Sequence, residues 1–201
     1  GETPELLEVQ FPLMREILTA AGIPYLWDDL LEADDLIACA CKSLSGHKYI
    51  VSNDKDLLQL VRDDVTVVSR KGGSDVEITP EHFREMYDGL EPIQITDLKA
   101  IAGDTSDNIK GVDGVGDKGA MLFVQKYGNV ETIAQQTEFP KEFSRYAKKM
   151  AAGREAMLFA KQLTTLRDDK PIQLNHYEVN VSGLIAICES LAMHSIIKLL
   201  R

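Results

Sequence analysis

The feature that most constrains the fold is an alternation of strand-like and helix-like segments over the first 90 residues. Apolar runs at residues 23–27, 48–53 and 65–69 are typical of short strands, and the segments between them have helical spacing. Parallel strands need long crossover connections, which are usually helices. The alternation therefore predicts an α/β fold with a mostly parallel sheet and helices on both faces. From about residue 91 onward the pattern is helical only.

We accordingly expect three portions: an α/β portion over residues 1–90, a helical portion over 91–170 and a closing segment over 171–201. The first helix is expected to begin with Thr3 as its N-cap and to end before Gly22. The closing segment is expected to contain one helix over residues 181–200. Other expected helices span residues 33–44, 92–102, 118–127, 130–136, 140–151 and 154–166. Two more are expected, one through Leu57, Leu58, Leu60 and Val61 and one that begins at the Thr79-Pro80 cap.

Charge is distributed unevenly along the chain. The net charge of −10 disfavours a nucleic-acid partner at first sight. However, residues 141–170 carry eight cations against four carboxylates, whereas Arg15 is the only Lys or Arg within residues 1–40. This asymmetry is compatible with ordinary solvated helix faces and equally with a metal site beside a track for a polyanion.

Three cysteines, Cys39, Cys41 and Cys188, lie in apolar surroundings and lack metal-ligand spacing. We interpret them as reduced packing residues of a cytoplasmic protein. No apolar run approaches the roughly 20 residues that span a bilayer, so no membrane partner is expected.

Seven carboxylates form three short clusters. Taken singly, the clusters have ordinary explanations: complementing a helix dipole, capping a helix, or forming a turn. The second cluster, however, follows directly after the strand at residues 48–53, and open α/β sheets bind ligands at the carboxyl ends of their strands. The clusters are Glu32, Asp34 and Asp35, then Asp54 and Asp56, then Asp104 and Asp107.

Carboxylates gathered in one crevice repel one another unless cations neutralise them. Oxygen ligands without His or Cys favour Mg²⁺ or Mn²⁺. Two such ions about 4 Å apart can stabilise both the attacking and the leaving oxygen of a phosphodiester. The clusters together therefore predict a nuclease site with two divalent ions.

A glycine-rich link, Ile109–Ala120, joins two expected helices. Gly111, Gly114 and Gly116 permit a tight turn and close approach of another backbone. Free N–H groups at the start of the following helix can bind a phosphate, and Lys118 adds charge there. A plain helix-to-helix turn is the alternative, but a hairpin of this kind can also grip duplex backbone without reading sequence.

The order of four motifs, Glu-Ala-Asp-Asp, Asn-Asp-Lys-Asp, Gly-Asp-Thr-Ser-Asp-Asn and Gly-Val-Asp-Gly-Val-Gly-Asp-Lys, resembles the 5′-nuclease or flap endonuclease family. The resemblance runs from about residue 4 to 170 and is nearest to the 5′→3′ exonuclease domain of bacterial DNA polymerase I and its free-standing counterparts. It implies a PIN-like core, a helix-hairpin-helix module, and Mg²⁺-dependent cleavage of branched or 5′-flap duplex DNA in replication and repair.

The resemblance also assigns roles to positions. The seven carboxylates match the family's ligands for two Mg²⁺ or Mn²⁺ ions, and the hairpin matches one that binds DNA through K⁺. Lys55 follows as a candidate contact of the scissile phosphate, with a plain surface lysine as the equal alternative. The K⁺ would be held by the carbonyls of Ser106, Ile109, Val112 and Val115, and the DNA would contact Lys110, Gly114, Gly116 and Lys118.

This chain lacks the family's first strand, its ligand Asp and the basic helical arch. We therefore expect a fragment of a longer enzyme, with a missing N-terminal segment or a partner chain completing the sheet, and uncertain activity on its own. Two alternatives remain open: a structure-specific DNA-binding module that no longer cleaves, and a PIN-type ribonuclease. The hairpin argues against the ribonuclease, because it suits duplex DNA better than single-stranded RNA.

Overall fold

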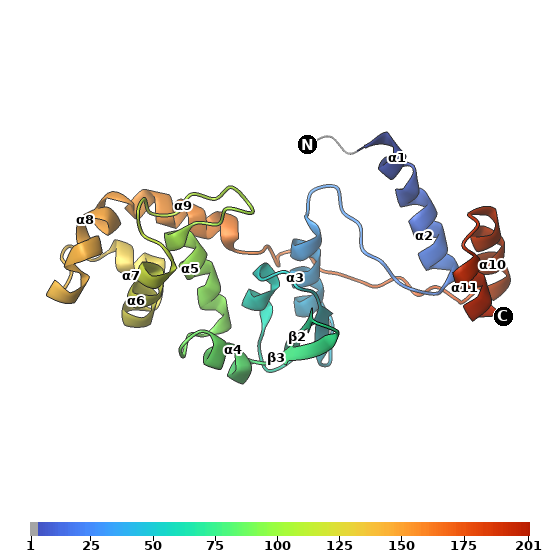
Figure 1. The fold of residues 1–201 in the computed structure, drawn as a ribbon, viewed down its shortest axis with the longest axis horizontal. Helices are drawn as coiled ribbons and strands as arrows, with labels where there is room; N and C mark the ends of the chain where they lie inside the picture. Colours follow the sequence, from blue (N-terminus) through green and yellow to red (C-terminus); the bar gives the residue numbers. More distant parts are fainter. Residues whose placement is uncertain (1–3) are drawn as a thin grey trace. The chain divides into compact units, whose positions relative to one another are not determined.

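The computed structural model describes residues 4–201, which form two compact units. The terminal unit comprises residues up to Leu30 together with Ile172–Arg201, and the central unit comprises Leu31–Pro171. Figure 1 shows the helices and strands of both units, coloured along the sequence. The predicted cap at Thr3 lies outside the described residues.

The terminal unit is helical. A small core forms where Leu184, Cys188 and Ile197 pack against Ile17 and neighbouring apolar residues. The connection is closed by a hydrogen bond from the Asn180 N–H to the Ala20 carbonyl (2.8 Å). Its helices are α1 (Glu5–Glu8), α2 (Gln10–Ala20), α10 (Val181–Ser190) and α11 (His194–Leu200).

Both long helices expected in this unit are interrupted. Pro12 has no N–H to donate to the Glu8 carbonyl, and its ring would clash with that carbonyl in a continuous helix. This explains why α1 ends at Glu8 and a new helix begins at Gln10. The predicted helix over residues 181–200 breaks where Ala192 adopts a left-handed φ of 54°. The single-helix predictions were therefore wrong at both ends of the chain.

The predicted strand over residues 23–27 is not formed. A strand exists only when a neighbour satisfies its backbone groups, and the described part of the chain gives this segment no ladder partner. Tyr25 instead stacks on Tyr177, with ring centroids 5.9 Å apart, and the Arg15 guanidinium lies over the Trp27 ring at 3.7 Å. Side-chain contacts of Tyr25 and Trp27, and not the hydrogen bonds of a sheet, thus stabilise this segment.

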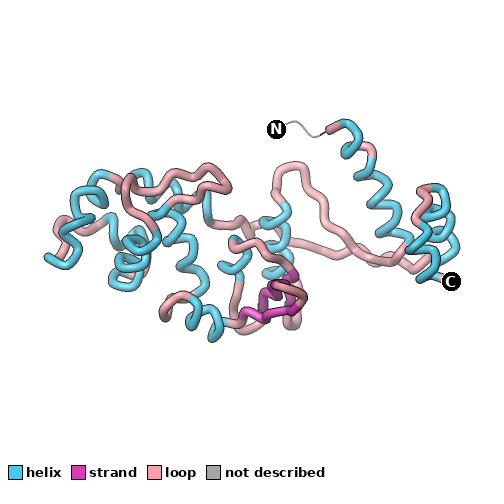
Figure 2. Tube along the Cα trace, viewed as in Figure 1, coloured by secondary structure: helices cyan, strands magenta, loops and turns pink. Residues whose placement is uncertain are grey.

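The central unit contains a three-stranded sheet in the order β1 (Lys48–Val51), β2 (Val65–Lys71), β3 (Ser74–Ile78). The β1–β2 pair is parallel and the β2–β3 pair is antiparallel. Figure 2 shows this small sheet in magenta among the helices. The architecture is α/β and PIN-like, but the sheet is mixed and not mostly parallel.

The antiparallel strand β3 was not predicted from the sequence. Gly72 and Gly73 adopt φ values of 58° and 86°, the left-handed region that tight hairpin turns require. The chain therefore reverses after β2 where a crossover helix was expected. Thr79 then caps α4 (Pro80–Met86) by accepting a hydrogen bond from the His82 N–H (3.3 Å), as its sequence position predicts.

In the part of the chain that the structure describes, strand β1 lies at the edge of the sheet and pairs only with β2. Its Ile50 side chain is buried, whereas Tyr49 and Val51 are 61% and 74% exposed. Alternate residues of a strand point to opposite faces. One face of β1 therefore packs on the core, and the other is open.

Helices make up the rest of the central unit. Phe123 is fully buried and contacts Phe139, Phe143 and Tyr146, so one aromatic cluster ties these helices together. The elements are α3 (Ala33–Ser43), η1 (Asp56–Leu60), η2 (Pro92–Gln94), α5 (Ile95–Ala102), α6 (Asp117–Tyr127), α7 (Val130–Ala134), η3 (Lys141–Phe143), α8 (Ser144–Ala152) and α9 (Arg154–Thr164), where η denotes a 3₁₀ helix. The helix predicted through Leu57 and Val61 is thus a short 3₁₀ helix, and the helix predicted from Pro140 begins with another.

Candidate metal centre

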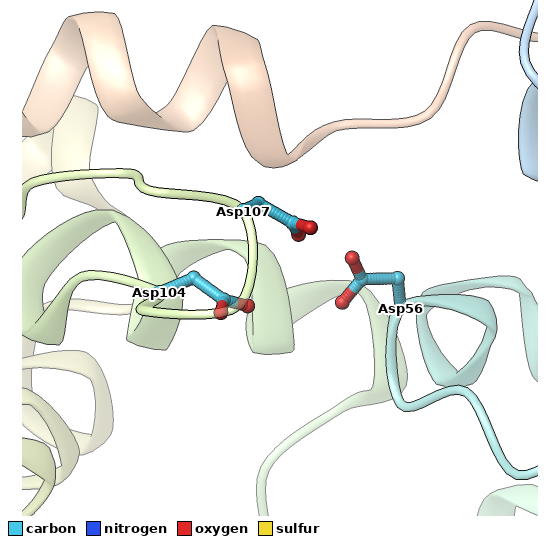
Figure 3. Close-up of side chains that lie close together, drawn as sticks. All are labelled: Asp56, Asp104 and Asp107. Carbon is cyan, nitrogen blue, oxygen red and sulfur yellow. The ribbon is translucent and has the colours of Figure 1, made fainter. Parts of the chain in front are cut away.

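Three carboxylates from two separate segments meet in the central unit. Asp56 lies at the start of η1, and Asp104 and Asp107 lie in the loop after α5. One oxygen of each lies within 4.8 Å of the others, and Figure 3 shows the three side chains pointing toward one another. This is the only such group of three or more within residues 4–201. It joins the second and third clusters of the sequence.

The backbone before η1 is folded tightly by its own side chains. Ser52 Oγ accepts a hydrogen bond from the Asp54 N–H (3.1 Å), and Asp54 Oδ1 accepts one from the Asp56 N–H (2.9 Å). Such local bonds are typical of Asp and Ser at the start of a helical turn. Asp54 therefore shapes the loop that presents Asp56 and is not itself in the group.

The loop after α5 is fixed by backbone bonds. Gly103 adopts a φ of 84° and ends the helix, and Asp104 and Ile109 then exchange two N–H···O=C bonds of 2.9 and 2.7 Å. Ser106 donates its N–H (2.9 Å) and its hydroxyl to Asp104 Oδ1. These bonds aim the Asp104 carboxylate back toward η1.

A lysine completes the group. Lys99, on α5, places Nζ 2.6 Å from Asp104 Oδ2 and forms a second ion pair with Asp56 Oδ1. Burial raises the pKa of Asp104, but hydrogen bonds from Lys99 and Ser106 outweigh that effect and lower the pKa to about 2. The carboxylate is thus ionised at neutral pH. Sequence reasoning did not single out Lys99.

The first predicted cluster serves other contacts. Glu32 is exposed at the N-cap position of α3. Asp34 Oδ1 accepts a hydrogen bond from the Asp35 N–H, and Asp35 Oδ1 accepts one from the Arg167 N–H, both in the range 2.8–2.9 Å. The structure does not bring these three carboxylates into the group around Asp56. Lys55, the N-cap residue of η1, is exposed.

The glycine-rich link continues directly from the loop that carries Asp104 and Asp107. Val112 and Val115 are buried and anchor the hairpin in the helical core. A Cβ on Gly119 would lie 2.7 Å from Val115, and one on Gly153 would lie 2.7 Å from Val112. These two glycines leave the room that the valines occupy, so the hairpin is held rigidly.

The predicted DNA contacts lie on the outside of this hairpin. Lys110, Gly114, Gly116 and Lys118 are all exposed, and Gly116 is the N-cap residue of α6. The N–H groups at the very start of an α-helix lack an acceptor within it, which makes such an end suited to an anion. Helix α6 contributes its dipole in the same direction.

Helix α8 extends the positive surface. Arg145, Lys148 and Lys149 are exposed on one side of it at helical spacing, and Lys149 Nζ donates a hydrogen bond to the Gly114 carbonyl (2.9 Å). One of the cations that the sequence places in residues 141–170, Lys149, therefore reaches the hairpin at Gly114.

The predicted K⁺ ligands are backbone carbonyls of the same segment. Those of Ile109 and Val112 accept hydrogen bonds from the N–H groups of Asp104 (2.9 Å) and Val115 (3.0 Å). A carbonyl oxygen has two lone pairs, so each retains one for a cation.

The donor set of the carboxylate group fits a hard divalent cation. It offers only carboxylate oxygens, which Mg²⁺ and Mn²⁺ prefer, and the Lys99 ammonium already occupies the position of a cation between Asp56 and Asp104.

Within the described residues, no helix has the length and apolar character to cross a membrane. All three cysteines are free and buried.

An α/β core with a carboxylate group beside a helix-hairpin-helix defines the class of this protein. A family model for the N-terminal, resolvase-like domain of 5′-3′ exonucleases matches residues 1–88, and one for their C-terminal SAM fold matches residues 90–184. The chain belongs to the 5′-3′ exonuclease family.

Two curated relatives show the extent of the match. The chain is 40% identical to a 5′-3′ exonuclease of Halalkalibacterium halodurans over 83% of its own length and 56% of the relative. It is 40% identical to DNA polymerase I of Bacillus subtilis over 91% of its length and 21% of the relative. The chain thus spans little more than half of the first relative and a fifth of the second.

A solved structure of the bacteriophage T5 D15 flap endonuclease, in a complex with DNA and metal ions, shares the fold. The TM-score is 0.67 at 26% identity, covering 98% of this chain and 66% of that one. The sequence-based assignment to this family, made from four motifs, is confirmed.

Proposed function

We propose that this chain is part of a structure-specific 5′-nuclease that hydrolyses DNA phosphodiesters with divalent metal ions. The observation that carries the proposal is that a single loop, Gly103–Gly116, holds both Asp104 and Asp107 of the carboxylate group and the glycine hairpin. A polyanion gripped by the hairpin would therefore lie beside the metal ligands.

The residues of this chain would hold Mg²⁺ or Mn²⁺ through Asp56, Asp104 and Asp107. When bound there, such an ion supplies activation of water and stabilises charge that develops on the phosphate. Ser106 and the Asp104–Ile109 bonds keep the Asp104 carboxylate in position. The remaining predicted ligands, Glu32, Asp34, Asp35 and Asp54, stay candidates for a second ion.

The substrate proposed is duplex DNA with a branch or a 5′ flap, as the complex of the T5 relative with DNA supports. Lys110, Gly114, Gly116 and Lys118 would contact one backbone, and α8 would add its exposed cations. Because these contacts are with phosphates, the affinity should fall steeply with salt.

Several finer predictions accompany the proposal. K⁺ held by the carbonyls of Ser106, Ile109, Val112 and Val115, a phosphate contact by Lys55, and a cytoplasmic location remain predictions. The open edge of β1 supports the expectation that a further segment or chain completes the sheet.

The test is cleavage of an end-labelled 5′-flap duplex in Mg²⁺ or Mn²⁺ against EDTA. Asp104→Asn is compared with Asp63→Asn, an exposed carboxylate outside the group. Metal-dependent cutting that Asp104→Asn removes and Asp63→Asn retains supports the proposal. Equal cutting by both variants contradicts it.

A non-cleaving DNA-binding module is the second candidate, because the group joins three of the seven predicted carboxylates and Lys99 already neutralises two of them. That candidate predicts flap binding that survives Asp104→Asn with no product in any metal. Preferential cleavage of single-stranded RNA would instead favour the ribonuclease.

A further inference from the structure

Lys99 forms ion pairs with two members of the carboxylate group, Asp56 and Asp104. It projects from α5, and its side chain is only 18% exposed. Its ammonium reaches two different elements, since Asp56 belongs to η1 and Asp104 to the loop after α5. A solvated surface lysine does not bridge two partly buried carboxylates in this way.

Lys99 holds one oxygen from each of two carboxylates, Asp56 and Asp104, that would bind a metal ion. Asp104 Oδ1 already accepts two bonds from Ser106, so Oδ2, which faces Lys99 at 2.6 Å, is the oxygen left for a cation. Asp56 offers Oδ1 to the same ammonium. A divalent ion bound to both oxygens would lie in direct contact with the ammonium, and like charges at that distance repel strongly.

We propose that Lys99 is an internal counter-ion of the metal-free centre, which a divalent ion must displace from Asp56 and Asp104 in order to bind. This inference rests on the proposed metal-dependent function. Lys99 is thus a positioning residue: it keeps the two carboxylates together without metal, and it sets how strongly metal binds. Its ammonium and the ion compete for the same oxygens.

Two consequences follow from this competition. Removing the positive charge leaves three carboxylates within 4.8 Å without compensation, so the metal-free protein becomes less stable. The same removal takes away the competitor, so a divalent ion binds more tightly. A lysine that only positioned the ligands for the ion would give the opposite second result, because its loss would weaken metal binding.

The experiment measures Mn²⁺ binding by calorimetry, and thermal unfolding in EDTA, for the wild type, Lys99→Met and Lys99→Arg. Lys126→Met, on an exposed lysine of α6, is the matched control. Lys99→Met is expected to bind Mn²⁺ about tenfold more tightly and to unfold at a lower temperature in EDTA. Lys99→Arg keeps the charge and is expected to stay near the wild type. Unchanged or weaker Mn²⁺ binding by Lys99→Met overturns the proposal.

A measurement on the wild type needs no folded variant. Acylation of lysines, read by mass spectrometry, should modify Lys99 faster in Mg²⁺ than in EDTA, while Lys126 reacts equally in both. A rate at Lys99 that does not rise with Mg²⁺ overturns the proposal. If the protein cuts flap DNA but fails these tests, the inference fails and the proposed function stands. If the protein passes these tests but does not cut DNA, the inference stands and the proposed function fails. If the wild type binds no Mn²⁺, the inference and the proposed function both fail.

Discussion

Replacing Gly111 by alanine should separate the hairpin from the end of α5. A Cβ at this position would lie 2.3 Å from the Ile101 carbonyl oxygen and 2.3 Å from the Gly103 nitrogen. Ordinary contacts begin at about 3.4 Å, so one of the two backbones has to move by about 1 Å. Because both neighbours are backbone atoms, no side-chain rotation can relieve the clash.

The expected cost combines two effects. Overpacking of this kind costs about 1–3 kcal/mol. The bond from the Val112 N–H to the Ile101 carbonyl, 2.7 Å long, crosses the same point and contributes about 1 kcal/mol when it breaks. A local destabilisation of about 2–4 kcal/mol corresponds to a roughly 30- to 700-fold faster hydrogen exchange of the Val112 amide.

Gly116→Ala is the matched control for this experiment. A Cβ there would meet nothing within 4 Å, and its φ of −95° suits any residue. The Val112 amide should therefore exchange as in the wild type, whereas flap-DNA binding should weaken if the DNA backbone approaches Gly116 closely. An exchange rate for Gly111→Ala within about threefold of the wild type would refute the reasoning.

Three further perturbations test the central unit. Phe123→Ala empties a fully buried aromatic site and should lower the free energy of unfolding in urea by about 3–5 kcal/mol. Asp97→Ala removes the partner of Lys161 (2.5 Å) and of the Val130 N–H (2.9 Å). The free energy of unfolding in urea should fall by about 3–5 kcal/mol, and a fall of less than about 1 kcal/mol would contradict a stabilising role for these contacts. The pKa of Asp104 is lowered from 3.8 to about 2. The contribution of its ionised form to stability is therefore complete above pH 3.8 and is lost as the pH falls through about 2. In the absence of metal, the unfolding temperature of Asp104→Asn should change less with pH across that range than that of the wild type.

The sequence predicts the parts of this site that local rules control. Asp56 lies shortly after a strand, and Asp104 directly follows the glycine that ends α5. Sequence patterns mark such element ends, so both positions could be predicted. Lys99 could not, because a lysine on a helix looks like any surface lysine, and its partner Asp56 lies far away in the sequence. Lys99 reaches Asp56 only because α5 packs against η1 in the folded chain.

The errors in the fold have physical causes of the same kind. The run at residues 23–27 has the composition of a strand, but strand formation depends on a neighbour that no local pattern specifies. Strand β3, by contrast, carried a usable signal, since Gly72-Gly73 between two strand-like segments favours a hairpin. Thr79 was correctly read as a cap because capping involves only the residues next to it.

Under the proposed function, DNA binding and metal chemistry would be coupled through the connection between α5 and α6. Asp104 is fixed at one end of that connection by its paired bonds to Ile109, and the hairpin is fixed at the other by Val112 and Val115 in the core. Neither part can shift without moving the other, because Gly111 brings the segment against the backbone of α5. A phosphate backbone held at the hairpin would thus stand at a set distance from the carboxylates, so specificity for a branched substrate would require no contact with the bases.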